Sequence, residues 1–177
     1  MIKCNLAVLL AERNIKISEL SKRTGISRTT LTALNQNQSK GIQFDTFDTL
    51  CTYLKISPND LFIQETLEYD FTVMDITEQQ TSPQIVADIN IQAEIKYKNA
   101  NFDDLIVCRV QLYDNGSSNF EIVSMTVNII YSENIIEILK SIPVTFKTSL
   151  EEELVESIKA EIIVKYNLNE DIDVQVW

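Results

Sequence analysis

The feature that most constrains the fold of this chain is a strict alternation of side-chain types between residues 85 and 97. Apolar side chains occupy every odd position from Ile85 to Tyr97, and all but the first of the even positions are polar or charged. A period of two over a stretch of this length predicts a long β-strand with one face on a core and the other in water.

The segments around this strand extend the pattern into an α+β domain over residues 69–177 with an antiparallel sheet. The turn-forming residues 114–119 favour a hairpin, and the natural assembly places the helices on one face of the sheet. Further strands are expected at 69–76, 104–113, 120–131 and 172–177, and helices at 133–139 and 150–166.

The longer of these helices has an apolar stripe and an acidic start in the sequence. Ser149 is the expected N-cap, and Leu150, Leu154 and Ile158 recur at helical spacing. The acids of residues 151–153 would then fall in the first turn and complement the helix dipole.

The front of the chain predicts an all-α domain of five short helices over residues 1–63. Gly25 is suited to end the second helix, Ser27 to cap the third, and Ser57 with Pro58 to begin the fifth. The helices are expected at 5–13, 17–23, 28–34, 44–54 and around 56–62.

Charge divides the chain at the same place. Residues 1–63 carry eight Lys and Arg against five acids, a net charge of +3, whereas residues 64–177 carry seven against 21, a net charge of −14. We therefore expect two domains joined by a polar linker, 64–68, with only the first able to approach a polyanion.

Several residue types that chemistry needs are absent or scarce. The chain has no histidine, only three glycines, and three cysteines without a CxxC spacing. This removes the usual general base and the glycine-rich phosphate loops, and it gives no sign of a zinc site or a disulfide framework. We expect no enzyme, no cofactor and no metal.

The chain also has no apolar run long enough to span a membrane, and its start lacks the form of a signal peptide. A cytoplasmic protein without a membrane partner is expected. The Gly116–Ser117 pair would suit a self-cleaving serine, but a simple turn explains it better. Asp103, Asp104 and Asp114 lack the spacing of a calcium loop, and charged strand ends are the simpler interpretation.

Residues 15–36 follow the helix-turn-helix pattern position by position. Ser21 is small enough for two helices to cross closely, Gly25 makes the turn, and Ile26 and Leu31 fill the space between the helices. With the later stretches KGIQFDT and SPNDLF, the first 63 residues or so resemble the Cro/phage-repressor (XRE-type) family of transcriptional regulators. The resemblance implies a recognition helix that enters the major groove of DNA.

The resemblance places Arg28 and Thr29 at base edges, with Thr32 and Ala33 one turn further along. Arg28 suits a bidentate contact to guanine, and the methyl groups of Thr29 and Ala33 suit a thymine methyl. A phosphate contact or a solvated charge remains the alternative for Arg28.

Contacts to DNA phosphates are expected from residues near the base-contacting positions and from the loop that follows. Ser27 and Thr30 offer hydroxyls, and Lys40, Gly41 and, more weakly, Gln43 lie in the loop where the family contacts the DNA backbone. The family commonly has Thr-Gln at the start of the second helix, where this chain has Lys16 and Ile17. Lys16 supplies charge there, but Ile17 cannot make the glutamine's contact.

The sequence thus predicts a DNA-binding transcriptional regulator, with repression as a homodimer as the expected mode of action. Residues 69–177 would dimerise and take a possible protein or small-molecule effector. The alternative is an antitoxin-like regulator whose acidic domain binds a protein partner.

Overall fold

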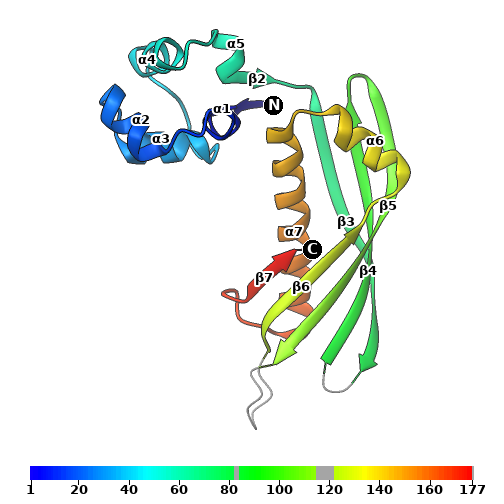
Figure 1. The fold of residues 1–177 in the computed structure, drawn as a ribbon. Helices are drawn as coiled ribbons and strands as arrows, with labels where there is room; N and C mark the ends of the chain where they lie inside the picture. Colours follow the sequence, from blue (N-terminus) through cyan, green and yellow to red (C-terminus); the bar gives the residue numbers. More distant parts are fainter. Residues whose placement is uncertain (82–83, 115–121, 177) are drawn as a thin grey trace. The chain divides into compact units, whose positions relative to one another are not determined.

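The protein is described from a computed structural model that covers residues 1–81, 84–114 and 122–176, shown in Figure 1. The chain forms two compact units, Met1–Thr66 and Leu67–Trp177, which are described one at a time. Gln64 ends a strand of the first unit and Leu67 begins a strand of the second. Only Glu65 and Thr66 of the expected linker therefore lie outside regular structure.

The first unit contains five helices close to the expected positions. Local signals explain their ends: Gly25 has a left-handed φ of 76° after the second helix, and the carboxylate of Asp60 accepts hydrogen bonds from the backbone N–H and the hydroxyl of Ser57 before the fifth. The helices are α1 (Leu6–Glu12), α2 (Ile17–Thr24), α3 (Arg28–Asn35), α4 (Phe44–Leu54) and α5 (Pro58–Leu61).

The expectation of an all-α unit is wrong, because two short strands close the unit. β1 (Ile2–Cys4) pairs antiparallel with β2 (Phe62–Gln64), with Ile2 opposite Gln64. The side chain of Asn37 accepts from the backbone N–H of Cys4 and donates to its carbonyl, which ties the loop after α3 to β1.

Leucines make the core of the first unit. Each helix contributes at least one, as the helical spacing of apolar residues requires. The buried leucines are Leu6, Leu9, Leu10, Leu20, Leu31, Leu34, Leu50, Leu54 and Leu61.

The second unit is a five-stranded sheet in the sequential order β3-β4-β5-β6-β7. The odd residues of β4 from Ala87 to Tyr97 are buried, as the alternation predicts. The strands are β3 (Leu67–Thr81), β4 (Gln84–Tyr97), β5 (Ala100–Asp114), β6 (Ile122–Ile130) and β7 (Asp173–Val176).

The expectation of an antiparallel sheet is wrong at one edge. β3 to β6 pair antiparallel, but β7 pairs parallel to β6, so the sheet is mixed. Two helices, α6 (Glu133–Ser141) and α7 (Val144–Tyr166), connect β6 to β7. A helical connection of this length returns the chain to the starting end of β6, which permits parallel pairing.

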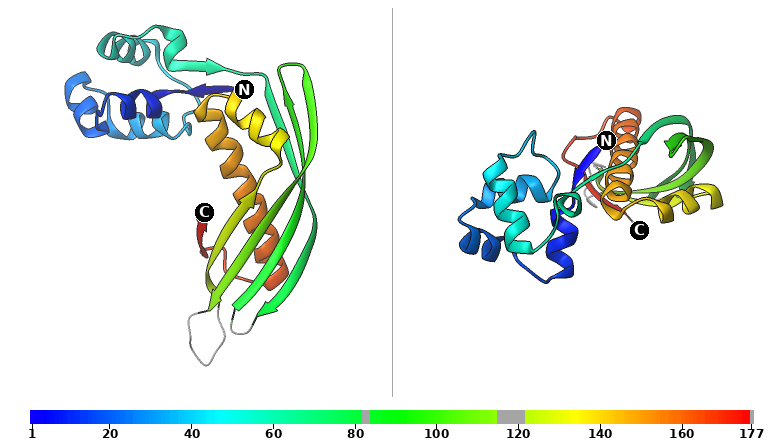
Figure 2. Two further views of the ribbon diagram at one scale, coloured as in Figure 1. Left: turned by 45° about the vertical axis from the view of Figure 1, so that its right-hand side comes forward. Right: turned by 90° about the horizontal axis from the view of Figure 1, so that it is seen from above.

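α7 lies along one face of the curved sheet (Figure 2) and is longer than the sequence predicts. It begins at Val144 after Pro143, so Ser149 is not its N-cap. Ser149 instead lies inside the helix, where its hydroxyl donates to the carbonyl of Thr145 at 3.2 Å. The acids of residues 151–153 consequently lie beyond the first turn.

Asp104 joins the sheet to α6. Its carboxylate accepts hydrogen bonds from the Ser132 hydroxyl at 2.6 Å, the Leu105 backbone N–H at 2.8 Å and the Asn134 side chain at 3.1 Å. Ser132 is also the N-cap of α6. These hydrogen bonds lower the pKa of Asp104 below its usual value.

Candidate nucleic-acid interface

The turn between α2 and α3 is held by hydrogen bonds at its two ends. The backbone N–H of Gly25 donates to the Ser21 carbonyl at 2.9 Å, and the Ser21 hydroxyl donates to the Ile26 carbonyl at 2.7 Å. Leu31 and Leu34 are buried and turn one face of α3 to the core. The opposite face of α3 is left for solvent.

The exposed end of α3 is its N-terminal turn. Ser27, Arg28, Thr29 and Thr30 are exposed. The Ser27 hydroxyl caps the helix by accepting from the Thr30 backbone N–H at 3.1 Å, and it lies 2.8 Å from the Thr30 hydroxyl. The sequence-predicted base-contacting residues begin in this turn, whereas Thr32 and Ala33 are half-buried one turn further on.

A hollow of about 570 Å³ joins Arg28 to the solvent face of α2. Arg23 forms an ion pair with Glu19 at 3.0 Å, but Lys22 and Arg28 have no ion pair within the described residues. Two unneutralised cations therefore lie on one surface. The lining residues are Ser18, Glu19, Lys22, Arg23 and Arg28.

Sequence reasoning missed Lys22. Its signal was available, because Ser18 and Lys22 are exposed and lie on the face of α2 opposite the buried Leu20. Their proximity to Arg28, however, depends on how α2 packs against α3.

The other residues predicted to contact the DNA backbone after α3 lie in the loop before α4. Lys40, Gly41 and Gln43 are all exposed. The Gly41 carbonyl accepts from the Ser39 hydroxyl at 2.6 Å, and Gln43 is the N-cap of α4. No hydrogen bond or ion pair among the described residues joins Lys40 or Gln43 to α3.

Lys16 is exposed at the N-cap of α2, and Ile17 follows it as the first helical residue. Ile17 is half-buried against the core of the first unit. The structure thus gives a packing reason for the residue that departs from the family pattern.

Together, α2, its glycine turn and the exposed start of α3 define a helix-turn-helix DNA-binding unit. A family model for the Cro/C1-type HTH DNA-binding domain matches residues 5–66. The uncharacterized HTH-type transcriptional regulator YozG of Bacillus subtilis (strain 168) is 35% identical over 57 residues, which are 32% of this chain and 68% of the relative.

The chain therefore belongs to the Cro/C1-type HTH transcriptional regulators, a DNA-binding family. No solved structure matches it. None of the helices within residues 1–81, 84–114 and 122–176 is long and apolar enough to cross a membrane.

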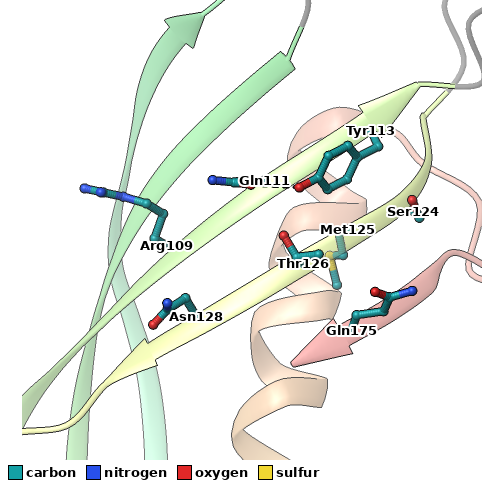
Figure 3. Close-up of a pocket in the computed structure, with 8 residues that line it drawn as sticks. All are labelled: Arg109, Gln111, Tyr113, Ser124, Met125, Thr126, Asn128 and Gln175. Carbon is teal, nitrogen blue, oxygen red and sulfur yellow. Dashed lines mark hydrogen bonds between the residues drawn. The ribbon is translucent and has the colours of Figure 1, made fainter. Parts of the chain in front are cut away.

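The second unit carries a polar hollow of about 550 Å³ on the open face of the sheet (Figure 3). Arg109 makes two hydrogen bonds to Asp88, at 2.7 and 3.0 Å, and the Tyr113 hydroxyl donates to Gln111 at 2.7 Å. Much of the polar lining is thus occupied by neighbouring side chains. The residues are Arg109, Gln111, Tyr113, Ser124, Met125, Thr126, Asn128 and Gln175.

Within the part of the chain that is described, no group of three or more Cys, Asp or Glu side chains is arranged to hold a metal ion. Cys4, Cys51 and Cys108 are free thiols, and burial raises the pKa of Cys108 to about 12. The Gly116–Ser117 pair lies outside the described residues.

Proposed function

We propose that the protein is a sequence-specific repressor that binds DNA as a homodimer, with α3 of each copy in the major groove. Residues 1–63 bind the DNA, and residues 69–177 dimerise. The observation that carries the proposal is the exposed N-terminal turn of α3, with Arg28 free of any described ion pair. This is the part of a recognition helix that reads base edges.

The side chains of α3 that read the bases have distinct roles in the proposal. Arg28 forms a bidentate contact to guanine, and the methyl groups of Thr29 and Ala33 pack against a thymine methyl. Thr32 lies one turn from Arg28 and completes the base-reading surface.

Phosphate contacts surround this surface. Ser27 and Thr30 offer hydroxyls at the start of α3, and Lys22 offers a cation from α2. Lys16 supplies a further charge beside Ile17, which stands where the family commonly has glutamine. Lys40, Gly41 and Gln43 contact the backbone from the loop before α4. Such contacts set the register of the protein on the duplex.

The charge distribution favours a dimer. A net charge of +3 on residues 1–63 supports only weak binding by one unit, so tight binding requires two half-sites about one helical turn apart. Residues 64–177 carry a net charge of −14 and are repelled by DNA. Occlusion of a promoter by the bound dimer then gives repression.

Fluorescence anisotropy on the duplex upstream of the protein's own gene, with a scrambled duplex as control, tests base readout. Arg28→Ala is expected to lose about 1–3 kcal/mol of preference for the cognate duplex. Arg28→Lys keeps the charge without the bidentate geometry and should also lose preference. Lys55→Asn removes a charge from the end of α4, where φ is 54°, and should keep the preference.

Equal binding of every variant to both duplexes would contradict base readout by Arg28. Sedimentation at several protein concentrations tests the homodimer, and a purely monomeric protein on its operator would refute it. A promoter fusion tests the direction of regulation, because reporter output that rises when the protein is supplied would exclude repression.

A second candidate function is favoured by the acidity of the second unit. An antitoxin-like regulator would use a surface of net charge −14 to bind a basic protein while the first unit regulates its own gene. A small basic protein that co-purifies in a fixed ratio would favour this candidate.

A further inference from the structure

The acidic run of α7 has no explanation in the helix dipole. α7 begins at Val144, so Glu151 and Glu152 lie two turns inside the helix, where the dipole no longer favours negative charge. Glu156 follows Glu152 by one turn, and like charges at this spacing destabilise a helix. One side of α7 therefore carries an unfavourable charge pattern.

These acids border a groove of about 480 Å³ between α7, β6 and β7. Ile129 of β6, Val155 of α7 and Val176 of β7 supply apolar walls, and Val176 is 52% exposed. Thr148, Glu151, Val155 and Glu156 recur at helical spacing, so this side of α7 is distinct from its buried stripe. The groove thus has an apolar base and an acidic helix beside it.

The charge of the groove is incompletely neutralised. Glu151 is 3.7 Å from the ammonium group of Lys147, but Glu152 and Glu156 have no ion pair within the described residues. The described residues that line the groove include no Lys or Arg. Tyr131, also in the lining, is half-buried, and desolvation raises the pKa of its phenol, so its ring is neutral near pH 7.

From this arrangement we propose that the groove between α7, β6 and β7 binds a small organic cation with an apolar body. The apolar walls bury the body, Glu152 and Glu156 attract the charge, and Tyr131 adds an aromatic side chain to the lining. The volume of the groove is in the range of known small-molecule binding sites. The acids disfavour an anion or the acidic unit of a second copy. This site does not depend on DNA binding.

Isothermal titration calorimetry of the full chain provides the test, with two probes of matched shape and opposite charge. Tetraphenylphosphonium is expected to bind at least about tenfold more tightly than tetraphenylborate, since only the cation is attracted by the glutamates. The double variant Glu152→Gln/Glu156→Gln should weaken tetraphenylphosphonium binding by about five- to tenfold. Raising the salt concentration should reduce the difference.

Two further variants separate the charge from the apolar wall. Glu137→Gln/Glu161→Gln removes two exposed charges outside the groove lining and should leave the affinity within about twofold. Val155→Ser should weaken binding about fivefold, because it exposes the wall to water. Far-UV circular dichroism confirms that each variant is folded.

Three results would overturn the proposal. The first is binding of tetraphenylborate as tight as that of tetraphenylphosphonium. The second is an equal loss of affinity in the groove variant and the control double variant. Binding of oligolysine without binding of tetraphenylphosphonium would indicate a docking surface for a basic protein instead.

Discussion

Gly25 adopts a φ of 76°, although a Cβ built there meets no atom within 4 Å. Gly25→Ala should therefore destabilise the protein by about 1 kcal/mol through backbone strain alone. Gly41 is equally open and is not in the left-handed region, so Gly41→Ala should be close to neutral. Urea denaturation measures both, and equal effects would contradict the argument from φ.

Lys22 tests whether the hollow beside Arg28 faces the DNA backbone. Lys22→Ala should weaken binding to cognate and scrambled duplexes alike and reduce the slope of log affinity against log salt by about one. Anisotropy titrations at several salt concentrations measure that slope. A loss confined to the cognate duplex would assign Lys22 to base readout instead, and Lys55→Asn serves as the control for lost charge.

For single residues, the sequence predicts those features that depend on residues nearby in the chain. The cap at Ser27 and the turn at Gly25 follow from residues within one helical turn, and both are confirmed. The proximity of Lys22 to Arg28 was not predictable in the same way, because it arises from the packing of two helices.

Among the elements, α6 depends on a carboxylate from a strand. Asp104 has a lowered pKa in the folded protein, so its contribution to stability is present above the pKa of the unfolded chain and is lost as the pH falls through the folded value. Asp104→Ala should cost about 1 kcal/mol at pH 7 and progressively less below about pH 4. Urea denaturation across this range measures the difference from wild type, which should shrink. A constant difference would exclude the carboxylate as the cause.

Element boundaries show the limits of local signals. Among the short helices, α2 ends at Gly25, and α3 and α5 begin at the caps of Ser27 and Ser57, while β4 follows its alternation. The strands β1 and β2 were missed because three-residue strands far apart in the sequence carry no pattern of their own. α7 was predicted to start late, because Ser149 and the acids after it imitate a helix start.

For the whole molecule, the contacts of residues 1–66 predict that this unit folds alone, since it contains its own leucine core and closing strands. A fragment of residues 1–66 should show a cooperative thermal transition by circular dichroism. If residues 69–177 dimerise the protein, the fragment should bind the operator at least about tenfold more weakly than the full chain. A folded fragment with undiminished affinity would refute dimerisation through the second unit.

The direction of β7 could not be derived from composition or alternation. The side-chain pattern of a short edge strand is the same whether the strand pairs parallel or antiparallel. The parallel pairing of β7 with β6 depends on the end of the sheet at which the chain leaves α7. The charge difference between the two parts of the chain, in contrast, needed no structure.

The β1–β2 pair has a consequence for protein engineering. Because Ile2 lies opposite Gln64, the two ends of the first unit emerge side by side. A module built this way tolerates circular permutation and insertion into a host loop, since a short peptide can bridge its ends. We therefore expect that the helix-turn-helix unit can be inserted into a host protein as a cassette.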